Sequence, residues 1–205
     1  MGRFAELLAH EGVEEDLALR SRFGFMAFHG GNLEVGTDVA AALAAERAGA
    51  SLYAVRQPSG LRWHLPSTEV TPDDSPALAA FLDHVDVAVA LHGYGRDDMW
   101  TTLLAGGQHR ELAGHLASHL RTALPDGYLV VDDLDAIPPE LRGVHPDNPV
   151  NRPSPVGGVQ LELPPRVRSR TPFWATLPEG APIPHLDDLV TGLAAAATTW
   201  PDVRG

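Results

Sequence analysis

The stretch that decides the fold is FGFMAFHGGNLEVGTDVAAALAAERAG, residues 23–49. Its apolar start, Phe23–Phe28, predicts a buried strand, and the alanine-rich run Thr37–Ala48, capped by its own first residue, predicts a helix. Between the two, His29 is followed by two glycines and, five positions later, by Glu34. A histidine and a glutamate on a glycine-rich connection between a strand and a helix indicate a functional loop.

The same arrangement occurs a second time in VAVALHGYGRDD, residues 87–98. The apolar run Asp86–Leu91 predicts another buried strand, and it ends in His92 with Gly93 and Gly95 close behind. Because ligand sites of open α/β sheets lie beyond the carboxyl ends of the strands, we expect the two histidines to approach each other there.

The rest of the chain alternates between strand and helix patterns. Further strands are expected at Ser51–Val55, Leu61–Leu65, Thr101–Ala105, Tyr128–Val131 and Val159–Leu163, helices at Pro76–His84 (capped by Ser75), Gln108–Ala123 and Leu186–Thr199, and a loop at Pro138–Gly158. This order predicts an α/β fold in a single domain over residues 1–205, with a mixed, largely parallel sheet and helices on both faces.

Composition excludes several kinds of chemistry. The 205 residues contain no cysteine, so thiolate nucleophiles, disulfides and cysteine-ligated metals are absent. Lysine is absent too, which excludes a Walker loop, a lysine Schiff base and a protein-kinase site. Ten histidines and 27 carboxylates supply nitrogen and oxygen ligands for a metal. A formal charge of −12 argues against a nucleic-acid partner.

Targeting signals are not evident in the sequence. No run of about 18 apolar residues predicts a membrane span, and the charged segment Met1–Asp16 lacks the apolar core of a signal peptide. We therefore expect a cytoplasmic protein without a membrane partner. Secretion stays open if a leader was removed, and the oligomeric state is not indicated.

His29, Glu34 and His92 form a candidate metal site. Two histidines and one glutamate, with a further position for water, are a known ligand set of catalytic zinc. The alternative is that both histidines are structural and that the glycines only make turns.

Glu162 is the candidate general base. In GVQLELPPRVRSR, residues 158–170, alternation places Val159, Leu161 and Leu163 on one strand face and Gln160 with Glu162 on the other. Desolvation would raise the pKa of a carboxyl group in this apolar setting, which suits a base that takes a proton from a metal-activated water. The alternative is a strand whose polar face meets solvent.

A rival metal site lies in the helix at residues 108–123. Glu111, His115 and His119 share one helix face at intervals of four, a geometry that can bind zinc. An amphipathic surface helix explains the same residues, because they lie along the edge of its apolar stripe.

Four segments in this order resemble the phage-type poly-γ-glutamate hydrolase family: FHGGNLEVGT, VALHGYG, HPDNPVNR and GVQLELPPRVR. The resemblance covers about residues 23–168 and implies a zinc amidohydrolase with a zinc-carboxypeptidase-like fold. It places the zinc ligands on His29, Glu34 and His92 and the catalytic carboxylate on Glu162.

The resemblance also marks residues for substrate binding. Asn151 and Arg152 match an Asn-Arg pair of the family, and Arg168 matches an arginine after its QLEL segment. These arginines, with Arg166 and Arg170, can bind a carboxylate bidentately, although solvated surface arginines are an equal alternative. His64 and Ser67 occupy the histidine-containing segment of the family, without an assigned role.

The expected function is zinc-dependent hydrolysis of γ-glutamyl amide bonds. The substrate would be poly-γ-glutamate or a shorter γ-glutamyl or N-acyl amino-acid amide, attacked by a metal-activated water with Glu162 as general base. The alternative is a catalytically inactive relative that binds a glutamyl ligand or a partner protein.

Overall fold

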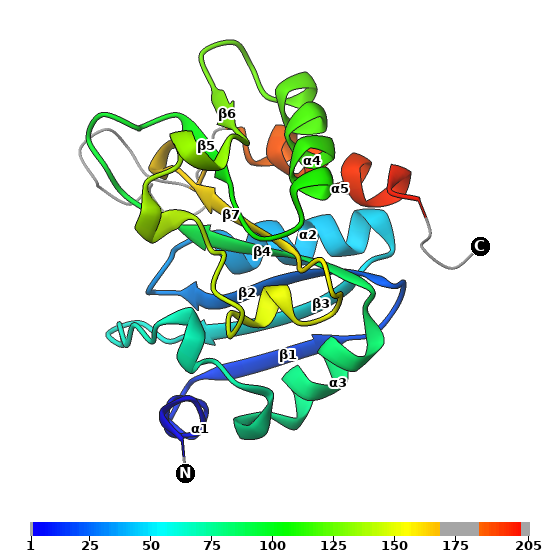
Figure 1. Ribbon diagram of the computed structural model, residues 1–205. Helices are drawn as coiled ribbons and strands as arrows, with labels where there is room; N and C mark the ends of the chain where they lie inside the picture. Colours follow the sequence, from blue (N-terminus) through cyan, green and yellow to red (C-terminus); the bar gives the residue numbers. More distant parts are fainter. Residues whose placement is uncertain (1, 169–184, 202–205) are drawn as a thin grey trace.

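A computed structural model describes residues 2–168 and 185–201. One seven-stranded sheet runs through this part of the chain, in the order β1-β3-β2-β4-β7-β5-β6 (Figure 1). The strands are β1 (Glu14–Ala18), β2 (Phe23–Gly31), β3 (Ser51–Gln57), β4 (Val87–Gly93), β5 (Thr102–Ala105), β6 (Leu129–Val131) and β7 (Val159–Leu163).

The sheet is mixed and largely parallel, as the sequence predicts. The four central strands β3, β2, β4 and β7 run parallel to one another. At one edge β1 is antiparallel to β3, and at the other edge β5 is antiparallel to β7 while β6 runs parallel to β5. The parallel centre brings the carboxyl ends of β2, β4 and β7 to the same side of the molecule.

Helices cover both faces of the sheet (Figure 1). They are α1 (Arg3–Leu8), α2 (Thr37–Ala48), α3 (Pro76–His84), α4 (Arg110–Ala123) and α5 (Leu186–Thr199). Short 3₁₀ turns are η1 (Ser67–Glu69), η2 (Pro72–Asp74), η3 (Leu134–Ala136), η4 (Pro139–Leu141), η5 (Pro149–Asn151) and η6 (Pro165–Val167). The helices α2, α4 and α5 pack on one face and share the larger apolar core, whereas α1 and α3 pack on the other face around a second core. None of the described helices is long and apolar enough to cross a membrane.

Capping explains where the helices begin. Ser75 Oγ accepts a hydrogen bond from the backbone N–H of Leu78 at 2.8 Å, with Pro76 at the first position of α3, as predicted. The helix α4 begins two residues later than predicted, because the side chain of His109 caps it by accepting from Leu112 N–H. In α2 the cap is Gly36 rather than Thr37, whose hydroxyl instead donates to the backbone carbonyl of Glu34.

The structure differs from the sequence predictions about elements in three respects. The segment Leu61–Leu65 is not a strand: both edges of β3 are already occupied, and the side chain of Gln57 binds the backbone N–H and carbonyl of Trp63. The elements α1 and β1 were not predicted at all. The strand β2 continues past Phe28 and contains His29, so this histidine lies within the strand rather than on the loop after it.

Candidate active site

The carboxyl ends of three adjacent strands deliver the candidate residues to one cleft. His29 lies on β2, His92 on β4 and Glu162 on β7, and His92 and Glu162 are direct partners in the register of β4 and β7. The rings of His29 and His92 have centroids 5.0 Å apart. The cleft has a volume of about 580 Å³, and its lining includes both histidines, Glu34 and Glu162.

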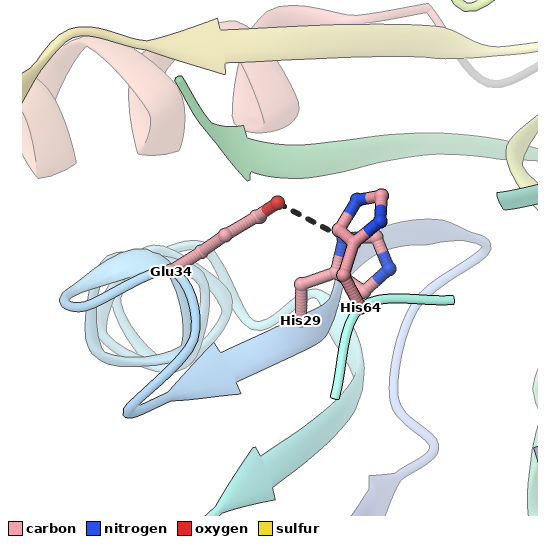
Figure 2. A group of neighbouring side chains, drawn as sticks. All are labelled: His29, Glu34 and His64. Atoms are coloured by element: carbon pink, nitrogen blue, oxygen red, sulfur yellow. Dashed lines mark hydrogen bonds and ion pairs between the residues drawn. The ribbon is translucent and has the colours of Figure 1, made fainter. Parts of the chain in front are cut away.

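Two contacts hold the ring of His29 in place. Its Nε2 lies 2.8 Å from the backbone carbonyl of Leu65, which can only accept, so Nε2 carries a hydrogen. Its Nδ1 lies 3.0 Å from Oε1 of Glu34 (Figure 2). A proton on Nδ1 or a metal ion can join this nitrogen to the carboxylate. This donor set fits a metal ion, because second-shell carbonyls commonly orient metal-binding histidines in this way.

Glu34 is held as a carboxylate. Burial alone would raise its pKa, but the charges and N–H groups of His29 and His92 lower the pKa of Glu34 far below its usual range. Its Oε2 also accepts the backbone N–H of Gly93 at 2.9 Å. The backbone N–H of Glu34 in turn donates to the carbonyl of His29 at 2.9 Å, which closes the loop that places the two side chains together.

His64 completes a group of three potential metal ligands. One ligand atom each from His29, Glu34 and His64 lies within 4.8 Å of the others (Figure 2). The bonds between Gln57 and Trp63 hold the segment that carries His64 beside β3. Burial lowers the pKa of His64, with a further contribution from His29, so its neutral, metal-binding form is favoured. Sequence reasoning assigned no role to His64, and its position in the histidine-containing segment of the family was the signal that could have found it.

His92 lies on the other side of Glu34. Its Nδ1 is 3.6 Å from Oε2 of Glu34, and its Nε2 is buried without a hydrogen-bond partner among the described residues. Burial would lower the pKa of His92, but the carboxylate of Glu34 outweighs this and raises it. His92 is outside the group of three, and its predicted role as a ligand stays a prediction.

Glu162 is a buried residue in the lining of the cleft. Its side chain is 4% exposed, and Oε1 accepts a hydrogen bond from Gln160 Nε2 at 2.8 Å. Desolvation by burial is the main cause that raises the pKa of Glu162 to about 7. A carboxyl group with such a pKa can exchange a proton near neutral pH.

The rival group on α4 does not assemble as a metal site. His115 Nε2 lies 3.0 Å from the backbone carbonyl of Ala196, and the hydroxyl of Thr199 contacts both His115 and His119. Glu111 is exposed. The two histidines therefore connect α4 to α5, and the described residues place no third ligand beside them.

The residues predicted to bind substrate are not part of the cleft lining. Asn151 is buried and its Nδ2 donates to the carbonyls of Gly143 and His145 at 2.8 and 2.9 Å. Arg152 is exposed, and Arg170 lies outside the described residues. Arg168 is buried and donates to the carbonyls of Leu163, Val35 and Tyr94 at 2.9, 3.0 and 2.9 Å. Substrate binding by Asn151, Arg152 and Arg168 stays a prediction.

The contacts of Arg168 join the chain segments that carry the site. Val35 follows Glu34, Tyr94 follows His92 by two residues, and Leu163 follows Glu162. A Cβ atom on Gly93 would lie 2.5 Å from the guanidinium carbon of Arg168, so only glycine lets β4 pass this closely. Arg168 therefore joins the loop after β2 to the ends of β4 and β7.

Replacing Arg168 by Met is expected to lower the free energy of unfolding by roughly 3–4 kcal/mol, because buried carbonyls lose charge-assisted hydrogen bonds. Chemical denaturation measures this, and the exposed Arg152→Met is the control, with a change below about 0.5 kcal/mol. Unchanged stability of Arg168→Met together with a loss of kcat/KM would instead assign Arg168 to substrate binding.

A largely parallel sheet that gathers histidines and carboxylates into a cleft at its strand ends is the arrangement expected of the active site of an α/β enzyme. The chain belongs to the poly-gamma-glutamate hydrolase family, whose sequence model matches residues 3–175. No significantly similar sequence is found among the curated proteins.

Solved structures share the fold over nearly the whole chain. A bacteriophage poly-gamma-glutamate hydrolase is 27% identical with a TM-score of 0.73, over 93% of this chain and 91% of the phage protein. YNDL, in an apo form described as zinc-free, is 22% identical with a TM-score of 0.69, over 91% and 90% of the two chains. An N-formylglutamate amidohydrolase from Ralstonia eutropha JMP134 is 14% identical with a TM-score of 0.51, over 91% and 95%.

Proposed function

We propose that this chain is a zinc-dependent hydrolase of γ-glutamyl amide bonds, acting on poly-γ-glutamate or on shorter γ-glutamyl or N-acyl amino-acid amides. The observation that carries the proposal is the contact of 3.0 Å between His29 Nδ1 and the carboxylate of Glu34, with His64 beside them. Membership in the family supports the substrate class, and the zinc-free description of YNDL supports zinc as the metal.

His29, Glu34 and His64 are the proposed zinc ligands, with His92 as the alternative third ligand. Bound there, zinc would polarise the scissile carbonyl and acidify the attacking water.

Side chains of this protein carry out proton transfer, charge stabilisation and substrate binding. Glu162 takes the proton of the attacking water and passes it to the leaving amine, for which its pKa of about 7 is suited. We assign to His92 the stabilisation of negative charge on the carbonyl oxygen; its pKa is raised, and its buried Nε2 has no hydrogen-bond partner among the described residues. Arg152 has an exposed side chain, and we propose that it binds a carboxylate of the substrate.

Incubation of the purified protein with poly-γ-glutamate tests the proposal. The viscosity of the polymer is expected to fall, to stop falling after a chelator is added, and to fall again after zinc is restored. Product sizes distinguish internal cleavage from trimming at a chain end. Binding of the polymer without cleavage in the presence of zinc would favour the inactive relative.

The net charge of −12 predicts an effect of salt on the long substrate. Repulsion between two polyanions slows their encounter and is screened by salt, so raising ionic strength from about 0.02 to about 0.2 M should increase kcat/KM by roughly 2- to 10-fold. A γ-glutamyl dipeptide carries little charge and serves as the control. A decrease in kcat/KM with rising ionic strength, seen for the long polymer alone, would show that attraction to local positive charge dominates.

A further inference from the structure

Two buried amide side chains connect a wall of the cleft to Glu162. Asn148 Nδ2 donates to Gln160 Oε1 at 2.7 Å, and Gln160 Nε2 donates to Glu162 Oε1 at 2.8 Å. Asn148 and Gln160 are 2% and 5% exposed, so water does not compete for these bonds. Both amides also line the cleft, within reach of the reacting groups.

The backbone sets the direction of this chain of hydrogen bonds. Asn148 caps the turn η5, where its Oδ1 accepts the backbone N–H of Val150 at 3.4 Å. Because an N–H group can only donate, the amide of Asn148 must turn its Nδ2 toward Gln160. The oxygen of Gln160 is then occupied, and its NH₂ group faces Glu162.

The backbone of Gly143 packs against the side chain of Gln160. It has a φ of +62°, and a Cβ atom there would lie 2.5 Å from Cβ of Gln160 and 2.7 Å from its Oε1. The carbonyl of Gly143 accepts from Asn148 Nδ2 at 3.4 Å and from Asn151 Nδ2 at 2.8 Å. The backbone thus lies directly on the Gln160 side chain and limits its rotation.

We propose that Gln160 and Asn148 are positioning residues, which hold Glu162 with Oε1 bound and Oε2 turned to the cleft as the atom that exchanges the proton. Within the part of the chain that the structure describes, no side chain or backbone group bonds to Oε2. A carboxylate without this anchor would lose the orientation that proton transfer needs. The inference rests on the proposed function, in which Glu162 is the general base.

Two near-isosteric variants test the positioning. Gln160→Met removes the donor to Glu162, and Asn148→Asp places an acceptor against Gln160 Oε1, which forces the amide of Gln160 to turn its oxygen toward Glu162. In both, kcat on the γ-glutamyl substrate is expected to fall about 10- to 100-fold, while KM and zinc content stay within about 2-fold of the unmutated values.

Gln108→Met is the matched control. Gln108 also binds the same loop, through Nε2 to the carbonyl of Val144 at 2.8 Å, but it is not in the chain that ends on Glu162. Its kcat should stay unchanged. An equal loss of kcat in this control, or losses of zinc and substrate affinity that parallel kcat in the other two variants, would overturn the proposal.

The double variant with Glu162→Gln separates positioning from independent catalysis. Adding Gln160→Met to Glu162→Gln should lower kcat little further, because the side chain to be positioned no longer acts as a base. Fully multiplicative losses would contradict a role through Glu162.

NMR of the Gln160 side-chain amide in metal-free protein supplies a readout that does not need catalysis. Its resonances are expected to shift in Asn148→Asp and in Glu162→Gln but not in Gln108→Met. This measurement reports the orientation in folded protein without catalysis, a normal amide spectrum of the rest of the chain confirming the fold of each variant, and unshifted resonances would overturn the proposal. If the resonances shift as expected while the unmutated protein cleaves no γ-glutamyl bond, the proposed function fails and the anchoring of Glu162 stands.

Discussion

Replacing Glu162 by Gln is expected to lower kcat by about 10²- to 10⁴-fold, the usual contribution of a positioned general base. The amide keeps the shape of the side chain and can still accept the hydrogen bond from Gln160. It cannot take a proton from water. Zinc content and substrate affinity should therefore stay close to those of the unmutated protein, measured by metal analysis and by equilibrium binding.

Glu111→Gln is the control for this loss, because it removes an exposed carboxylate on α4 far from the described cleft lining. Its kcat should not change. Normal turnover of Glu162→Gln would refute Glu162 as the base, whereas loss of zinc in this variant would make Glu162 a ligand.

The same variant should change how stability depends on pH in the metal-free protein. Burial raises the pKa of Glu162 from 4.5 to about 7, so the folded state binds this proton more tightly than the unfolded state. The stability that the protonated Glu162 adds to the folded state is fully present below a pH of about 4.5 and is lost as the pH rises through about 7. Between pH 5 and 8, the unfolding free energy of Glu162→Gln should therefore gain roughly 2–3 kcal/mol relative to the unmutated protein. Parallel pH profiles would mean that Glu162 ionises normally.

The strand ends were predictable because the sequence repeats one local pattern. An apolar run comes directly before both His29 and His92, and a glycine follows each histidine. Parallel strands bring their carboxyl ends together on one side of the sheet. Alternation in β7 placed Glu162 opposite Leu161 and Leu163, and the structure agrees: those leucines lie in the core while Glu162 lines the cleft. These patterns are local in the sequence, and the parallel sheet determines where their residues meet in space.

His64 could not be placed from local pattern. Its segment has apolar spacing that resembles a strand, yet its position depends on the side chain of Gln57, which binds Trp63 through two hydrogen bonds. The edge strand β1 was missed for a similar reason. Its acidic residues fit an exposed segment, but Glu15 accepts from the buried Tyr53 and from Ser75, contacts that join distant parts of the chain.

Arg168 shows a further limit of sequence. An arginine near an active-site motif can bind a substrate carboxylate or the protein's own carbonyls, and both uses need the same side chain. In the structure, carbonyls of three separate segments accept from its guanidinium. Only the arrangement of those segments in space distinguishes the two uses.

The other large expected effect is the loss of zinc affinity when the third zinc ligand is replaced. His64 has a ligand atom within 4.8 Å of those of His29 and Glu34, whereas His92 contacts Glu34 from its other side. Since each ligand contributes several kcal/mol to zinc binding, His64→Gln should weaken zinc affinity by roughly 10²-fold or more. His92→Gln should keep zinc and lose turnover, because it removes the imidazole proposed to stabilise negative charge on the carbonyl oxygen.

Zinc titration followed by thermal unfolding measures this without catalysis, because a ligand that binds only the folded state raises its Tm. Zinc should raise the Tm of the unmutated protein and of His92→Gln, and have little effect on His64→Gln. His115→Gln is the control, since His115 binds Ala196 at the contact of α4 and α5. If zinc instead fails to stabilise His92→Gln and still stabilises His64→Gln, His92 is the third ligand, as the sequence alone predicts, and His64 lies only at the rim of the cleft.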